Sequence, residues 1–285
     1  MAGARGVPNI MFRDKMQRQR FELKYRLTEE LAWQVREFVA AHLELDENGV
    51  GKPDYSYPVH SLYLDSDQLF TYWATVNGNK NRFKLRIRFY NPDPSTPVFL
   101  EIKRRVDNVI FKQRAGVHKA AVPAILAGQL PAPSELISTD ASQLAAAQRF
   151  LALAQELNAR PKVHVAYRRE AWVDPRGTHL RVTFDRQVQA EPRGVVDFST
   201  ALVNPVSPFG RQVILELKFT NFFPLWFREL VERFDLVRTS AAKYCDAVDV
   251  IGPERLGPSL HRATGLPSEW PCTEPVWPMA AVSTG

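Results

Sequence analysis

Alternation of apolar and basic residues in the segment Phe83–Phe89 constrains the fold more than any other feature of this chain. The segment reads FKLRIRF, so Lys84, Arg86 and Arg88 project to one side of a strand and four apolar side chains project to the other. A strand of this kind packs its apolar side against a hydrophobic core. The pattern therefore predicts a half-buried sheet with one cationic face.

Seven further segments alternate in the same way, which gives about eight strands. They are residues 20–25, 59–65, 99–103, 109–114, 163–169, 180–185 and 213–218. Helical periodicity falls between the strands. It predicts a helix capped by Thr28, a shorter one from Asp67, and two longer ones over 140–157 and 221–236. The expected fold class is α+β with a mostly antiparallel sheet and helices packed on its outside.

The chain of 285 residues is long enough for one large domain. We expect a loose arm over residues 1–18, a folded domain over 19–251 and a Pro-rich tail over 252–285. Trp270 and Trp277 could dock the tail on the domain. With 45% hydrophobic and 24% charged residues, the composition argues against wholesale disorder and against a membrane-embedded protein.

The remaining composition bears on compartment and partner. No apolar run reaches the length of about 18 residues that a membrane-spanning helix needs, and the N-terminus does not read as a secretory signal. Cys245 and Cys272 cannot build a disulfide framework or a zinc site, so a reducing, cytoplasmic compartment is expected. The net charge of +6 favours an anionic partner.

Eight strands covered by helices on their apolar side can close into a barrel, whose interior holds side chains or one slender ligand. Closure would direct these basic residues into the lumen: Lys24, Arg86, Arg88, Lys103, Lys112, Arg114, Arg169, Arg181 and Lys218. Such a lumen needs an anion, because like charges repel strongly in a reduced dielectric. A mixture of Arg and Lys suits a chain of phosphates. For any single strand, the alternative is that its charged face is only the solvated side of an ordinary sheet.

Carboxylates share the same faces, since three glutamates each precede a lysine by two positions. The pairs are Glu22 and Lys24, Glu101 and Lys103, and Glu216 and Lys218. Carboxylates that face phosphates either neutralise neighbouring bases or hold a hard cation such as Mg²⁺ or Mn²⁺. Both interpretations stay open for each glutamate.

Other chemistry has weak support. The sequence contains no P-loop, dinucleotide-binding, zinc-protease or nucleophile-elbow motif. We interpret His60, His164 and His179 as structural groups and Cys245 as a small packed residue. Nucleic acid is disfavoured as a partner, because the aromatic residues alternate onto the side opposite to the bases.

Nine motifs, in their order and spacing, resemble the VTC domain, the polyphosphate polymerase domain of the vacuolar transporter chaperone family. This family lies within the triphosphate tunnel metalloenzyme, or CYTH-like, superfamily. The motifs span residues 20–248 and read RFELKY, SLYLD, KLRIRFY, FLEIKRR, FKQR, YRREAW, LRVTFD, LELKF and AAKYCDAV. The resemblance implies a closed eight-stranded antiparallel tunnel and an enzyme that uses Mn²⁺ or Mg²⁺. Its implied reaction transfers the γ-phosphate of ATP to a polyphosphate chain and releases ADP.

The resemblance also implies site residues. Phosphate contacts are expected at Lys24, Arg86, Arg88, Lys103, Lys112, Arg169, Arg181, Lys218 and Lys243. Those expected to act in catalysis are Arg86, Arg88, Lys103, Arg169 and Lys218. The metal ligand is expected at Glu216, with Glu101 and Glu22 as weaker ligands.

The chain departs from the family pattern at two positions. Arg20 stands where the hydrolase and cyclase branch has its first Glu, which favours the polymerase-like branch. Ala242 stands where the VTC branch usually has Ser, so that hydroxyl contact is absent or is supplied by Ser240. The membrane and SPX segments of the fungal protein do not occur in this sequence, so a membrane partner would be a separate chain.

The expected partners are ATP and inorganic polyphosphate or triphosphate, and the chain is expected to be a monomer or weak oligomer. Two alternatives to the polymerase stay open. One is hydrolysis of triphosphate or a nucleoside triphosphate in the same tunnel. The other is a non-catalytic module that binds polyphosphate.

Overall fold

The computed structural model describes residues 20–107, 109–177, 180–220 and 222–257. For residue 20 the description is limited to the backbone. The predicted N-terminal arm lies outside these residues. So do His179 and the tail beyond residue 257, with Trp270 and Trp277.

The eight predicted strands are all present in one antiparallel sheet. They are β1 (Arg20–Leu27), β3 (Ser56–Asp65), β4 (Asn81–Phe89), β5 (Val98–Val106), β6 (Val109–Val117), β7 (Arg160–Val173), β8 (Arg181–Pro192) and β9 (Val213–Thr220). Their order is β1-β9-β8-β7-β3-β4-β5-β6, and the short strand β2 (Glu44–Leu45), which was not predicted, pairs with β7. Two meanders, β3–β6 and β7–β9, are thus joined through the pairing of β3 with β7.

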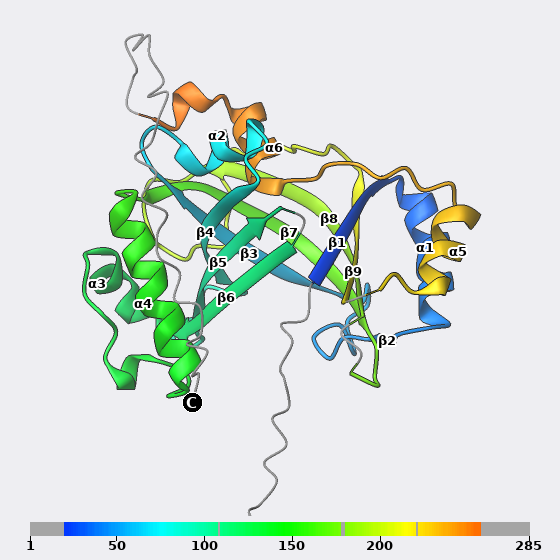
Figure 1. Ribbon diagram of the computed structural model, residues 1–285, viewed down its shortest axis with the longest axis horizontal. Coiled ribbons are helices and arrows are strands. Elements are labelled where there is room, and N and C mark those ends of the chain that lie inside the picture. The colour runs from blue at the N-terminus through cyan, green and yellow to red at the C-terminus, as the bar shows by residue number, and fades with distance from the viewer. Residues whose placement is uncertain (1–19, 108, 178–179, 221, 258–285) are drawn as a thin grey trace, which may run out of the picture.

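The two strands at the ends of this order lie next to each other. Cα atoms of β1 and β6 approach within 8 Å, and in the ribbon diagram one end of β1 lies near an end of β6 (Figure 1). Within the described residues, however, no hydrogen-bonded ladder joins β1 to β6. The structure therefore confirms an α+β fold with a large antiparallel sheet, but it does not show the sheet as a closed barrel.

Six α-helices occur in the described part of the chain. They are α1 (Glu29–Ala40), α2 (Phe70–Val76), α3 (Val122–Leu126), α4 (Ala141–Glu156), α5 (Leu225–Arg233) and α6 (Lys243–Ile251). The predicted cap of α1 is confirmed, since the Thr28 hydroxyl accepts a hydrogen bond from the Leu31 amide at 3.2 Å. Helices α3 and α6 were not predicted.

Two helices begin later than predicted, for identifiable reasons. Helix α2 begins at Phe70 instead of Asp67, because the Asp65 carboxylate accepts hydrogen bonds from the amides of Thr71 and Tyr72. Helix α5 begins at Leu225 instead of residue 221. Pro224 stands at its N-cap, where an extended backbone starts the helix.

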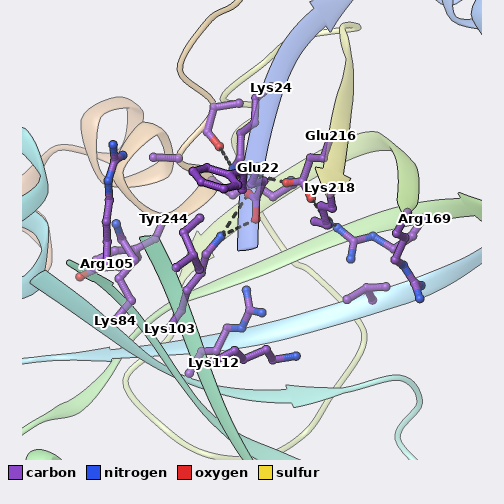
Figure 2. Close-up of a pocket in the computed structure, with 18 of the residues that line it drawn as sticks. Glu22, Lys24, Lys84, Lys103, Arg105, Lys112, Arg169, Glu216, Lys218 and Tyr244 are labelled. Carbon is purple, nitrogen blue, oxygen red and sulfur yellow. Dashed lines mark hydrogen bonds and ion pairs between the residues drawn. The ribbon is translucent and has the colours of Figure 1, made fainter. Parts of the chain in front are cut away.

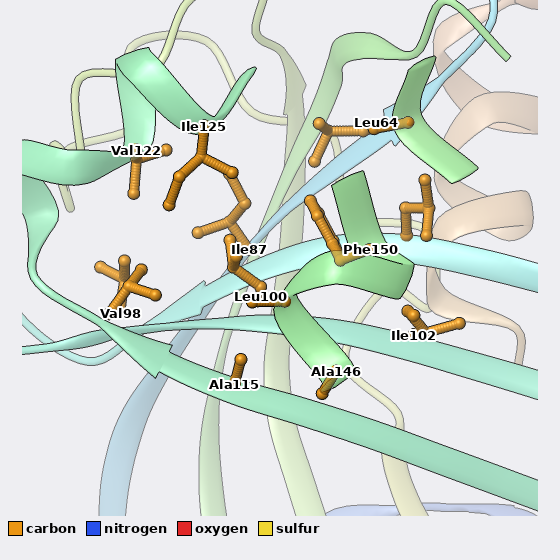
Figure 3. Packing of buried hydrophobic residues seen from close by; sticks show 14 of the residues in the cluster. Leu64, Ile87, Val98, Leu100, Ile102, Ala115, Val122, Ile125, Ala146 and Phe150 are labelled. Atoms are coloured by element: carbon orange, nitrogen blue, oxygen red, sulfur yellow. The ribbon is translucent and has the colours of Figure 1, made fainter. Parts of the chain in front are cut away.

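Helices cover the apolar side of the sheet at two places. Phe150 of α4 is fully buried in one hydrophobic cluster with Ile87 of β4 and Leu100 of β5 (Figure 3). Val35 of α1 packs in another cluster with residues of α5 and β9. Because side chains alternate along a strand, the basic residues of the covered strands face the opposite way. Helices α2 and α6 lie together at one end of the sheet (Figure 1).

None of the helices in the described ranges has both the length and the apolar character that crossing a membrane requires.

Candidate functional site

A cavity of about 1090 Å³ lies on the basic side of the sheet and is lined by all eight strands of the main order, with contributions from α2 and α6. Its lining contains all nine of the predicted phosphate-binding residues: Lys24, Arg86, Arg88, Lys103, Lys112, Arg169, Arg181, Lys218 and Lys243. In total, fourteen Lys and Arg residues line it, against the carboxylates of Glu22, Asp174 and Glu216. The alternating cations therefore converge on one space (Figure 2), and their phosphate-binding roles remain predictions.

Glu216 on β9 is the carboxylate with the largest number of cationic neighbours facing this space. Its oxygens lie 2.5 Å from the Lys218 ammonium, 3.2 Å from Lys243 and 3.3 Å from Lys24. The Arg169 guanidinium follows at 3.5 Å. Burial alone would raise the pKa of Glu216, but these cations outweigh it and hold the pKa well below its usual range. Glu216 is therefore an anion surrounded by bases from β1, β7, β9 and α6.

Asp185 on β8 is a member of the site that the sequence reasoning did not select. Its carboxylate is fully buried and accepts two hydrogen bonds of 2.7 Å from the Arg169 guanidinium. The Lys243 ammonium lies 2.6 Å from it. The available signal was the alternation that puts Asp185 on the same face as Arg181.

Glu101 on β5 lies beneath the cavity surface and is not among the residues that line it. Its fully buried carboxylate contacts Arg86 at 2.6 Å and Lys112 at 2.7 Å, with Arg114 at 3.5 Å and Arg88 at 3.9 Å. Burial favours the neutral form, yet these cations hold the pKa of Glu101 well below its ordinary value. Glu101 therefore acts as a counter-charge that fixes basic side chains.

Glu22 on β1, in contrast, lines the cavity. It contacts Lys103 of β5 at 3.1 Å and Lys24 at 3.2 Å. The contact with Lys103 joins β1, at one end of the sheet order, to β5, which is the neighbour of the other end strand, β6.

Tyrosine hydroxyls complete the cavity wall and were also missed by the sequence reasoning. The Arg86 guanidinium donates to the Tyr63 hydroxyl at 3.2 Å, and that of Arg88 donates to the Tyr167 hydroxyl at 3.1 Å. Tyr63 stands between Leu62 and Leu64, and Tyr167 shares a strand face with Val163 and Val165, so their sequence pattern looks like that of core residues. Ser240, the predicted substitute for a serine at position 242, does line the cavity.

His60 and His164 fit their structural interpretation. His60 and His164 are buried and contact each other through Nδ1 and Nε2 at 3.1 Å. Burial lowers the pKa of each to about 4, so both are neutral at physiological pH. Cys245 is buried in the cluster that contains α6.

Comparison with protein families gives a match to the VTC domain over residues 19–251. The chain belongs to the VTC domain family. This family contains polyphosphate polymerases, and its members act on phosphate substrates. No curated protein matches the chain.

Two solved structures share 11% and 13% sequence identity with this VTC domain. The first is a candidate adenylate cyclase from Bacillus halodurans, with a TM-score of 0.44 over 78% of this chain and 93% of that one. The second is the PH1819 protein of Pyrococcus horikoshii, with a TM-score of 0.38 over 79% of this chain and 93% of that one.

A divalent metal in the VTC domain would need oxygen donors that face the cavity. Among the described residues, no three His, Cys, Asp or Glu side chains come together as a metal-binding group. Glu22 and Glu216 do line the cavity on neighbouring strands, and both contact the Lys24 ammonium. Mg²⁺ is commonly held by one or two carboxylates together with substrate phosphates and water, and Mn²⁺ prefers the same oxygen ligands. The donor set therefore fits a cation held jointly with phosphate. Glu101 is not among the residues that line the cavity, and its role as a weaker metal ligand stays a prediction.

Phosphate binding by the VTC domain should depend on pH through Lys112. Burial and the guanidinium groups of Arg86 and Arg88 lower the pKa of Lys112 to about 7, although the Glu101 carboxylate opposes them. Its cross-strand neighbour is Lys103, another cation. A bound polyanion favours the protonated form of Lys112. Above pH 7 the free protein has mostly neutral Lys112, so binding must be accompanied by uptake of a proton from solution. We expect affinity for tripolyphosphate to fall by up to about tenfold between pH 6 and pH 8 from this group.

Titration calorimetry of tripolyphosphate at several pH values measures this effect, and Lys112→Arg is the matched control. Arginine keeps its charge throughout the range. The affinity of the variant should therefore carry only the titration of the ligand and of other groups. Parallel pH profiles for the wild type and Lys112→Arg would contradict the prediction.

Proposed function

We propose that this chain is a metal-dependent polyphosphate polymerase that transfers the γ-phosphate of ATP to a polyphosphate chain. The observation that carries the proposal is the cavity, in which fourteen basic residues outnumber three carboxylates, within a family that contains polyphosphate polymerases. A cavity with this charge favours a ligand with many anionic groups. Inorganic polyphosphate and the triphosphate of ATP are such ligands.

In the proposed reaction, a terminal oxygen of the chain attacks the γ-phosphorus of ATP. The bond from that phosphorus to the bridging oxygen breaks, and ADP leaves with the electron pair. The attacking oxygen is already ionised at neutral pH, so neither a protein nucleophile nor a general base is required. Catalysis then rests on position and on electrostatic stabilisation.

Side chains of this chain are already fixed for that task. Glu101 holds Arg86, and Asp185 holds Arg169 through two hydrogen bonds, so these guanidinium groups need little reorganisation when phosphates bind. Lys103 and Lys218 would neutralise the phosphates on either side of the reacting one. Glu216 and Glu22 would hold Mn²⁺ or Mg²⁺, which would offset charge on the phosphate oxygens.

We further propose that the sheet encloses its substrate as a tunnel. Two observations support this: the approach of β1 to β6, and the ion pair of Glu22 on β1 with Lys103 on β5, the strand next to β6. A tunnel would let a growing chain pass through while its end stays at the reacting phosphates. A reducing, cytoplasmic location and a separate membrane partner stay predictions.

Incubation of the purified protein with ATP and Mn²⁺ tests the proposal. ADP and a ladder of phosphate chains are expected on a gel. Lys103→Met protein, prepared identically, should form no ladder and controls for contaminating kinases. Orthophosphate without a ladder would identify a hydrolase instead. Thermal stabilisation by polyphosphate without any turnover would identify a binding module.

A further inference from the structure

One end of the cavity carries basic side chains that the proposed transfer does not use. Arg82 and Lys84 of β4 and Arg105 of β5, here called the end cluster, all line the cavity. Arg82 is paired with Arg105 in the sheet register, and Lys84 with Lys103. In the close-up, Lys84 and Arg105 lie on the opposite side of the pocket from Arg169 (Figure 2).

Arg82 and Lys84 differ from the nine predicted phosphate-binding residues in their charge balance. Eight of those nine contact Glu22, Glu101, Asp185 or Glu216, as described above, and Arg181 contacts Asp46 at 3.0 Å. In the part of the chain that the structure describes, no carboxylate lies within ion-pair distance of Arg82 or Lys84. Lys84 donates to the Thr75 hydroxyl at 2.7 Å, and Arg82 donates to the Asn79 carbonyl. These neutral partners leave the positive charge in place.

The two guanidinium groups of the cluster are also near each other. Burial and the neighbouring Arg105 lower the pKa of Arg82, which is the effect of a second positive charge nearby. Arg105 is itself held by a 2.7 Å hydrogen bond from its Nε to the Asp107 carbonyl. Two guanidinium groups placed together create a positive potential that attracts an anion.

The position of the cluster indicates which anion this is. Each step along one face of a strand is about 7 Å, so the pair Arg82 and Arg105 lies roughly 14 Å along the strands from Arg86. A triphosphate bound around Arg169 and Lys218 is on the other side of the cavity. A longer chain of phosphates can span both places.

We propose that Arg82, Lys84 and Arg105 form a subsite for inorganic polyphosphate beyond the phosphates held at the centre. The cavity then selects long polyphosphate over triphosphate. This inference rests on the proposed polyphosphate reaction, because it assigns the end cluster to the acceptor chain. The selectivity would come from charge-assisted hydrogen bonds between the end cluster and phosphate oxygens. Only a chain long enough to reach the cluster can form them.

Binding measurements with tripolyphosphate and with a long-chain polyphosphate test the subsite without any need for turnover. Arg82→Gln and Arg105→Gln should each weaken binding of the long chain by about tenfold, the effect of one lost hydrogen-bonded charge. Binding of tripolyphosphate should not change, which also shows that the variants are folded. Arg168→Gln is the matched control, since Arg168 pairs with Asp54 at an exposed position and is not among the lining residues.

Two results would overturn the subsite: equal losses for both ligands in Arg82→Gln and Arg105→Gln, or no loss for the long chain in either variant. Failure of the polymerase proposal would show itself separately, as an absence of chain growth from ATP. Long-chain binding that still depended on Arg82 and Arg105 would then assign the same subsite to a polyphosphate-binding protein.

Discussion

Replacement of Glu216 by Gln is expected to lower phosphate transfer from ATP by about 100-fold or more while phosphate binding persists. Losing one preorganised electrostatic group at a reacting centre commonly has an effect of this size. The amide keeps the shape of the side chain but removes the negative charge that faces Lys24, Lys218 and Lys243. The cavity therefore becomes more positive, so tripolyphosphate measured without metal should bind at least as tightly as to the wild type.

The split between transfer and binding is what makes this variant informative. ADP release and chain growth with Mn²⁺ would be followed beside calorimetry of tripolyphosphate without metal. Glu29→Gln is a suitable control, because Glu29 pairs with Arg186 outside the cavity. It should leave both measurements unchanged. A Glu216→Gln protein that still extends polyphosphate at the wild-type rate would exclude Glu216 from the reaction.

The strands and their faces were accessible from the sequence because a period of two is a local property. Arg86 and Arg88 line the cavity, as the alternation in Phe83–Phe89 predicted, while Ile87 is buried beneath α4. The same argument placed basic residues from six other strands on one face. The alternation within a single strand could not show that the basic residues of different strands converge on one cavity, because this depends on how the eight strands are oriented in the folded sheet.

Partners of the buried carboxylates could not be read from the sequence. Asp185 meets Arg169 of β7 and Lys243 of α6, and the second of these is 58 positions away along the chain. Glu101 was grouped with Glu22 and Glu216 because all three precede a lysine by two positions. The structure separates them, since Glu101 is enclosed by four basic residues under the cavity surface.

Local signals also failed at particular helix ends. Helix α6 has nine residues and no side-chain cap at Ala242, so neither its length nor its start was evident. The carboxylate at the start of α2 comes from Asp65, at the end of β3, and not from the more obvious Asp67. Asp67 pairs with Lys162 instead. The start of each of these helices is therefore determined by tertiary contacts.

Replacement of Asp185 by Asn is expected to cost about 3 kcal/mol of unfolding free energy, which urea denaturation at neutral pH measures. Removing one partner from a buried ion pair leaves the other charge without compensation. Here Arg169 and Lys243 would remain buried, and Glu216 would be the carboxylate among the described residues that still contacts both. These cations hold the pKa of Asp185 below its ordinary value of 3.8, against the effect of burial. Its stabilising contribution is therefore present above that pH and is lost as the pH falls below it.

Asp54→Asn is the matched control, because Asp54 also pairs with an arginine but is 52% exposed. A surface pair of this kind contributes about 0–1 kcal/mol, so this variant should unfold near the wild-type urea midpoint. Tripolyphosphate should narrow the gap between Asp185→Asn and the wild type, since its oxygens can approach Arg169 and Lys243 from the cavity and take over part of the lost charge. Equal destabilisation by the two substitutions, or a gap that tripolyphosphate leaves unchanged, would mean that Asp185 does not serve as the counter-charge for the phosphate-binding bases.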